Sequence, residues 1–166
     1  RPEPVEGQAG FDKLSPNGTV SLRAKVRCDD PRWSAVLDEW LSHVESVEDL
    51  GVMAEGLEDE SYGEVAIAAA ERIRSGRADR GILVCGTGIG VAIAANKVPG
   101  VRATVAHDSF SVERSILSND CQILTFGQRV IGLQLALRLA DERQYRHGRS
   151  GCPPGMEQLE ERFSSR

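Results

Sequence analysis

The sequence predicts a three-layer α/β/α fold around a parallel sheet of roughly five strands. Short apolar stretches alternate along the chain with segments whose apolar residues recur at helical spacing, which is typical of repeated strand–helix–strand units. The clearest unit lies at residues 80–97, where an apolar run leads through a glycine-rich turn into an alanine-rich segment. Because crossovers in such units are right-handed, we expect helices on both faces of the sheet.

Length and composition set the broad class of the protein. The 166 residues suit one domain with a substantial core, and the net charge of -5 argues against a general binder of nucleic acid or membrane surfaces. No apolar run is long enough for a transmembrane helix, and the beginning of the chain lacks a signal-peptide pattern. The four cysteines lack C-x-x-C spacing, so neither a zinc site nor a disulfide scaffold is indicated, and we expect a cytoplasmic location.

Three regions follow from the local composition. Residues 1–19 carry three prolines and three glycines without periodicity, and we expect a disordered N-terminal extension. Residues 20–146 hold the alternating pattern and form the predicted domain. Residues 147–166 are expected to form a C-terminal tail with a short helix that packs on a partner subunit.

The first half of the domain contains two predicted strands, at 20–28 and 47–50, and two predicted helices. Asp30 and Pro31 supply a helix cap and a first-turn proline for the helix that follows the first strand. The apolar stripe of this helix includes Trp33 and Trp40, which we interpret as core residues. An acidic loop at 51–61 leads to an alanine-rich helix at 63–74.

The second half alternates more regularly. Strands are predicted at 81–84, 101–106 and 122–126, and helices at 89–97, 110–117 and 132–145. Buried cysteines are expected at Cys28 and Cys121. The last helix is expected to turn five apolar side chains inward, namely Leu133, Leu135, Ala136, Leu139 and Ala140.

The turn at 86–90 is the candidate functional loop. Its three glycines allow a sharp turn and the close approach of a ligand, and the helix after it offers unpaired N–H groups to an anion. Cys85 ends the preceding strand, at the edge where open α/β sheets bind ligands. An ordinary strand–turn–helix with a structural cysteine is the alternative. The spacing does not supply the G-x-G-x-x-G pattern of a nucleotide-binding fold.

Three motifs together resemble one known family. They are Cys-Gly-Thr-Gly-Ile-Gly at 85–90 with Ala-Ala-Asn-Lys at 94–97, Val-Pro-Gly-Val-Arg-Ala at 98–103, and Asn-Asp-x-x-Ile-Leu-Thr-Phe-Gly-x-Arg-Val-Ile-Gly at 119–132. They are similar to the ribose-5-phosphate isomerase B and galactose-6-phosphate isomerase (RpiB/LacAB) family. The resemblance is close over residues 79–141 and loose over 26–75, and it implies a Rossmann-like fold.

The resemblance implies aldose–ketose isomerisation of a sugar phosphate through an enediolate, with no cofactor and no metal. The family base corresponds to Cys85, and a thiol that faces a helix N-terminus is more readily ionised. Thr87 would move protons between the substrate oxygens. The backbone N–H groups of the loop would hold the developing oxyanion, which involves Gly86, Gly88, Ile89 and Gly90.

The resemblance also assigns the residues that bind the substrate. Arg129 and Arg149 would bind the phosphate, and Asp29 and Asn119 the sugar. His107 follows a predicted strand and could contact substrate, but a loop histidine hydrogen-bonded to backbone is an equal alternative. Family members are homodimers or homotetramers with shared sites, so Asn119 and Arg129 could serve the Cys85 of a neighbouring chain.

Departures from the family pattern bear on the substrate. Asp30 and Ser118 replace two family histidines, of which the second is credited with opening the furanose ring, and Pro153 replaces a phosphate-binding arginine. Either activity is lost or the substrate needs no ring opening. A tetrose 4-phosphate cannot close a five-membered ring, so we expect D-erythrulose 4-phosphate isomerisation, which residues 107–119 also resemble. A ribose-5-phosphate isomerase and a non-catalytic sugar-phosphate-binding subunit are the alternatives.

Overall fold

The computed structural model describes residues 20–25, 32–33, 46–50 and 61–145. The expected N-terminal extension, the C-terminal tail and most of the helix after Pro31 lie outside these residues. So do Cys28 and most of the acidic loop. The elements that the structure describes all fall within the predicted domain at 20–146.

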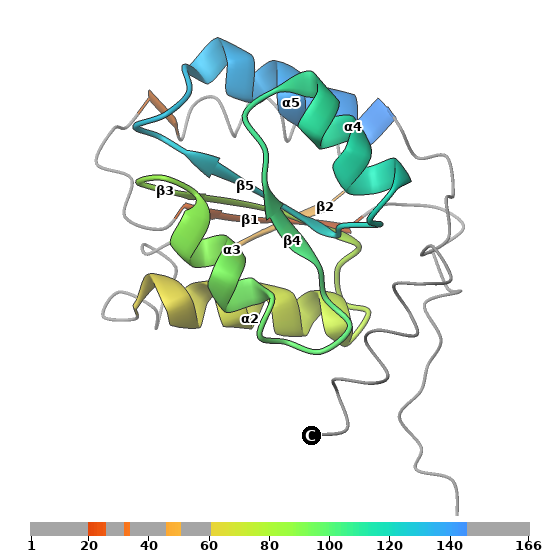
Figure 1. The fold of residues 1–166 in the computed structure, drawn as a ribbon. Coiled ribbons are helices and arrows are strands. Elements are labelled where there is room, and N and C mark those ends of the chain that lie inside the picture. Colours follow the sequence, from red (N-terminus) through yellow and green to blue (C-terminus); the bar gives the residue numbers. More distant parts are fainter. Residues whose placement is uncertain (1–19, 26–31, 34–45, 51–60, 146–166) are drawn as a thin grey trace, which may run out of the picture.

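Five parallel strands form one sheet, as the sequence predicts (Figure 1). They are β1 (Val20–Lys25), β2 (Ser46–Asp49), β3 (Arg80–Cys85), β4 (Ala103–Val105) and β5 (Ile123–Gly127), in the spatial order β2-β1-β3-β5-β4. The strand expected at 101–106 is shorter than predicted. Its first residue, Val101, instead donates its N–H to the Val98 carbonyl in the preceding turn.

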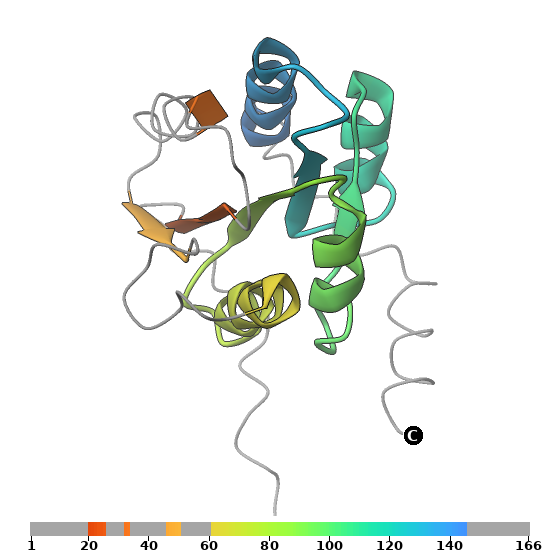
Figure 2. The ribbon, with the colours of Figure 1, turned by 90° about the vertical axis from the view of Figure 1, so that its left-hand side faces the viewer.

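Helices cover both faces of the sheet, α2 (Tyr62–Arg74) and α3 (Ile89–Ala95) on one and α4 (Ser109–Leu117) and α5 (Leu133–Tyr145) on the other (Figures 1 and 2). This confirms the three-layer prediction. Helix α3 ends two residues before the predicted end, where the Asn96 side chain joins the helix to β4. It accepts from the Ala103 N–H and donates to the carbonyls of Ala92 and Ala103. No helix of the described ranges is long and apolar enough to span a membrane.

Two apolar cores lie on the two faces of the sheet because successive strand residues point to opposite sides. On β3, Leu83 packs beneath α2 and α3, whereas Ile82 and Val84 pack beneath α4 and α5. Trp33 is buried in the second core, as expected, and Cys121 is also buried. Trp40 lies outside the described residues.

One prediction for α5 is wrong. Leu135 was expected to face inward, but 40% of its surface is exposed. Ala136, Leu139 and Ala140 carry the buried face of this helix. Leu135 precedes Ala136 by one residue, which corresponds to a rotation of about 100° about the helix axis and turns its side chain away from the sheet.

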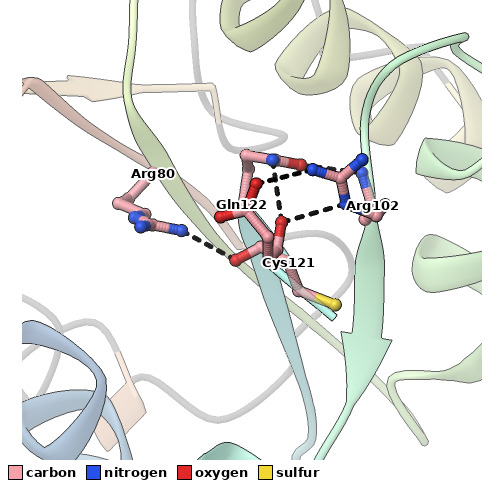
Figure 3. Close-up of polar contacts among 5 residues, drawn as sticks. Arg80, Arg102, Cys121 and Gln122 are labelled. Atoms are coloured by element: carbon pink, nitrogen blue, oxygen red, sulfur yellow. Dashed lines mark hydrogen bonds and ion pairs between the residues drawn. The ribbon is translucent and has the colours of Figure 1, made fainter. Parts of the chain in front are cut away.

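A polar network joins the amino ends of β3, β4 and β5 (Figure 3). The Arg102 guanidinium pairs with the Asp120 carboxylate at 2.7 Å and donates to the Asp120 carbonyl. The Gln122 amide accepts from the Arg102 N–H and donates to that same carbonyl. Arg80 donates to the Cys121 carbonyl at 2.8 Å, and burial lowers the pKa of Arg80. The loop before β5 is therefore fixed to both neighbouring strands.

Asp120 combines this ion pair with a left-handed backbone conformation, at φ 45°. We expect Asp120→Asn to lower the free energy of unfolding by about 1 kcal/mol, because asparagine tolerates this conformation and only the charge is lost. Asp120→Ala should cost about 1 kcal/mol more, because alanine disfavours a positive φ. Urea denaturation measures both differences.

The matched control is Glu71→Gln, which removes an ion pair to Arg74 whose partners are 40% and 51% exposed. It should change stability by less than about 0.5 kcal/mol. Equal losses for Asp120→Asn and Asp120→Ala would contradict the role given to the backbone conformation.

Candidate active site at the carboxyl edge of the sheet

The strand order places a crevice at the carboxyl end of β3. The chain runs from β1 outward to β2 on one side; it then crosses to β3, continues on the other side to the edge strand β4, and returns to β5 between them. Ligands of open α/β sheets bind where the strand order reverses in this way. Cys85 is the last residue of β3 and therefore lies at this edge. Asp29, a predicted substrate-binding residue, lies outside the described residues.

The loop after β3 directs a backbone donor at the Cys85 thiol. The Gly88 N–H donates to Cys85 Sγ at 3.1 Å. Gly88 adopts the left-handed conformation, with φ 81°, as the N-cap of α3. The half-buried Cys85 thiol therefore lies beside backbone donors at the edge where such sheets bind ligands.

Strand β5 supports the loop from below. The Thr125 hydroxyl donates to the Gly88 carbonyl at 2.8 Å. A side chain at Gly88 would come within 3.0 Å of the Phe126 carbonyl carbon, and one at Gly127 would come within 2.7 Å of the Thr87 backbone. These two glycines let the loop and the strand end touch directly. Thr125 is not among the predicted site residues, although a threonine inside an otherwise apolar strand could have indicated it.

Two of the remaining loop residues, Thr87 and Ile89, face outward. Thr87 is exposed, and its hydroxyl accepts from the Ile89 N–H at 3.4 Å. Ile89 is 54% exposed. Gly90 is covered by the ring of Tyr62, which would lie 2.8 Å from a Cβ at that position. The predicted loop residues, Cys85 to Gly90, thus gather at one edge with the Thr87 hydroxyl open to a ligand.

Arg129 lies against the same loop. Its backbone N–H donates to the Gly86 carbonyl at 3.1 Å, and the Gln128 N–H donates to the Cys85 carbonyl at 2.9 Å. The Arg129 guanidinium carbon lies 3.8 Å from the point where a Gly86 Cβ would be. An exposed cation is therefore held over the loop of its own chain. Arg149, the second predicted phosphate ligand, lies outside the described residues.

Asn119 lies at the opposite edge of the sheet from Cys85. It follows α4, and its side-chain amide donates to the Arg114 carbonyl at 3.0 Å. The next residue, Asp120, pairs with Arg102 at the amino end of β4. Because parallel strands have all their amino ends at one edge, a single chain does not bring Asn119 and Cys85 together. The same holds for Ser118, the C-cap of α4.

His107 bonds to backbone, which is one of the two alternatives that the sequence leaves open. Its Nε2 accepts from the Gly127 N–H at 3.0 Å. Burial lowers the pKa of His107 from its ordinary value of 6.5, and the neighbouring Asp108 opposes this effect. The imidazole is therefore neutral near pH 7, with its proton on Nδ1, because a ring nitrogen that accepts must carry a lone pair.

A cavity of about 480 Å³ opens beside the turn that carries Arg129. Arg32 and Gln128 give it polar groups, and Trp33, Ile131 and Leu133 give it apolar walls. The sequence does not predict that Arg32 lines a cavity, because its neighbours in the sequence do not distinguish it from an ordinary surface arginine. Among the described residues, no three His, Cys, Asp or Glu side chains gather as a metal site would require.

A family model described as Ribose/Galactose Isomerase matches residues 32–147. Among curated proteins, the chain is 49% identical over 134 residues to D-erythrulose-4-phosphate isomerase 2 of Mycolicibacterium smegmatis, with 80% of this chain and 79% of that protein covered. It is 44% identical over 91 residues to ribose-5-phosphate isomerase B of Escherichia coli, which covers 53% of this chain and 61% of that protein.

A solved structure, ribose-5-phosphate isomerase B of Clostridium thermocellum, shares the fold with a TM-score of 0.74 and 32% identity. The match covers 87% of this chain and 98% of that chain. It confirms the Rossmann-like α/β fold that the resemblance implies.

Gly88 and Gly100 provide a matched test of the contact between loop and strand. Both have φ near +80°, but nothing lies within 4 Å of a Cβ at Gly100. We expect Gly100→Ala to lower the free energy of unfolding by about 1 kcal/mol through backbone strain alone. Gly88→Ala should cost a further 1–3 kcal/mol, roughly, through overpacking against Phe126. Equal losses in urea denaturation would show that the contact is loose.

Proposed function

Because the chain belongs to the ribose/galactose isomerase family, we propose that it interconverts the ketose and aldose forms of a short sugar phosphate, D-erythrulose 4-phosphate and D-erythrose 4-phosphate. The observation that carries the proposal is the Cys85 thiol at the end of β3 with the Gly88 N–H on its sulfur. This arrangement places a thiol, the proposed base, beside a loop of backbone donors.

The reaction moves one hydrogen between two neighbouring carbons. The Cys85 thiolate removes a proton from the carbon next to the carbonyl, which leaves an enediolate and a neutral thiol. Backbone N–H groups of the loop at 86–90 stabilise the charge on the enediolate oxygen. The exposed Thr87 hydroxyl transfers a proton between the two substrate oxygens. Cys85 then returns its proton to the other carbon, which completes the exchange of carbonyl and hydroxyl.

The phosphate is bound by arginine. Arg129 supplies a cation over Gly86, close to the reacting end of the site. A guanidinium presents several donors to phosphate oxygens and holds its charge at every physiological pH. Arg149 is the second proposed ligand, by resemblance to the family. The cavity beside the Arg129 turn carries a further cation, Arg32, on its wall.

The preference for a four-carbon substrate rests on Ser118. A furanose must open before isomerisation, and this chain carries a serine where the family carries the ring-opening histidine. A tetrose phosphate esterified at O4 is open from the start and needs no such group. The similarity to the Mycolicibacterium smegmatis protein agrees with this choice. Ribose 5-phosphate isomerisation is the second candidate, favoured by the solved structure of the Clostridium thermocellum enzyme.

We also propose a homodimer or homotetramer with shared active sites. Asn119 and Cys85 lie at opposite edges of the sheet, so a site that uses both must draw them from two copies. Exposed apolar side chains beside the site, Ile89 and Ile93 on α3 and Phe110 on α4, offer surface for such contacts. A reducing cytoplasm would keep the Cys85 thiol available.

Cys85→Ala should abolish turnover, with a loss of at least about a thousandfold in kcat, because no other group replaces the base. The protein should remain folded, since Cys85 is half-buried and points toward the loop. A coupled assay of erythrose 4-phosphate formation measures the loss, and circular dichroism checks the fold.

The matched control is Cys121→Ala, which removes the buried thiol at the amino edge. It should retain most of the activity. Substantial activity in Cys85→Ala would overturn the catalytic assignment, and a wild-type chain inactive on every four-, five- and six-carbon sugar phosphate would favour the non-catalytic subunit.

The substrate proposal is tested at Ser118, an exposed helix C-cap where a larger side chain has room. Wild type should have a higher kcat/KM for erythrulose 4-phosphate than for ribose 5-phosphate. Ser118→His should raise kcat/KM for ribose 5-phosphate by about tenfold or more, because ring opening gains a general acid–base group. Ser118→Ala controls for loss of the hydroxyl. A wild-type preference for ribose 5-phosphate would refute the assignment to tetrose.

A further inference from the structure

The His107 imidazole takes the place of a backbone carbonyl at the end of the sheet. In the β4–β5 ladder, the Ile123 N–H donates to the Arg102 carbonyl, and later odd-numbered N–H groups of β5 point toward β4. Continued regularly, the ladder would bring the Gly127 N–H to the carbonyl of residue 106. Strand β4 has ended at Val105, and the Gly127 N–H meets His107 Nε2 instead.

Gly127 begins the turn that carries the phosphate-binding arginine. The backbone of Thr87 presses against it, and the next two N–H groups, of Gln128 and Arg129, donate to the Cys85 and Gly86 carbonyls. The turn is thus tied to β3 on one side through these two bonds. On the β4 side, the hydrogen bond from the Gly127 N–H to His107 holds the first residue of the turn.

We propose that His107 is a positioning residue, which holds the Gly127 N–H so that Arg129 stays over the Cys85 loop. The proposal rests on the function proposed above and assigns His107 no contact with the reacting atoms. Only the neutral imidazole can accept from Gly127, so protonation of His107 releases the turn on the β4 side.

The surroundings of His107 favour its neutral form. Burial lowers the pKa of His107, while Asp108, which directly follows it, acts in the opposite direction. Hydrogen bonds from Ser111 lower the pKa of Asp108 and keep that carboxylate charged. Within the described part of the chain, the other ionisable groups at this edge include Cys85 at the end of β3, Arg129 in the turn after β5, and Arg32 on the cavity wall. The bond to Gly127 is therefore present at neutral pH and weakens in acid.

Two variants separate positioning from other roles. His107→Gln keeps an acceptor oxygen at a reach comparable to Nε2 and does not titrate. His107→Ala removes the acceptor. At pH 8 we expect His107→Ala to raise KM for erythrulose 4-phosphate about five- to tenfold with a smaller change in kcat, because the phosphate is bound alike in substrate and transition state. His107→Gln should restore KM to within about threefold of wild type.

The pH profile gives a second readout. The ratio of kcat/KM in wild type to that in His107→Gln should be constant above pH 6.5 and fall as the pH drops below it, because only wild type loses its acceptor by protonation. Division by the variant cancels every pH dependence that the two proteins share. Asp108→Asn should move the fall to lower pH, because it removes the charge that favours the imidazolium.

A measurement that needs no substrate tests the positioning role of His107 separately from the proposed function. The Gly127 amide should be protected from hydrogen exchange in wild type and His107→Gln at pH 8, and exchange at least about tenfold faster in His107→Ala. This holds even if no sugar phosphate is turned over. Equal exchange in all three proteins would overturn the positioning role. So would a His107→Gln variant as impaired as His107→Ala while its Gly127 amide stays protected, since that result indicates direct contact with substrate.

Discussion

The direct contact between the loop after β3 and the end of β5 is the constraint on which the site depends. Gly88 and Gly127 meet backbone on the opposite segment, and the Thr125 hydroxyl bonds the Gly88 carbonyl across the contact. This contact fixes the conformation in which the Gly88 N–H points at Cys85 sulfur. It also brings the Arg129 turn against the carbonyls of Cys85 and Gly86. The Cys85 thiol and the Arg129 turn are thus positioned by one piece of backbone packing.

The two edges of the sheet divide structural and chemical roles. At the amino edge, the side chains of Arg102, Asp120 and Gln122 satisfy one another and the backbone between the strands. At the carboxyl edge, the thiol of Cys85, the hydroxyl of Thr87 and the guanidinium of Arg129 remain at or near the surface. Helix α4 connects the edges and ends at Ser118, far along the sheet from where it began.

Much of this arrangement is predictable from sequence because hydrophobic period and glycine position carry it. The alternation of strands and helices and the placement of Cys85 at a strand end both follow from the pattern. The exposure of Leu135 does not, because three consecutive apolar residues at 135–137 leave the angle of the helix face undetermined. The early end of α3 depends on Asn96 reaching β4, a tertiary contact. For His107 the sequence leaves two alternatives, a contact with substrate or a hydrogen bond to backbone. A choice between them requires knowing where β4 ends.

The packing of glycine against backbone also limits how such a site can diversify. A side chain at Gly88 or Gly127 would require the opposite segment to withdraw, and that movement would carry the Cys85 thiol and the Arg129 cation with it. Variation that leaves the Cys85 loop in place must therefore arise outside this contact. Positions such as Ser118, exposed at a helix end on the far edge, are free to change singly. Under the proposed function, proton transfer belongs to this fixed centre and the choice of sugar to the periphery.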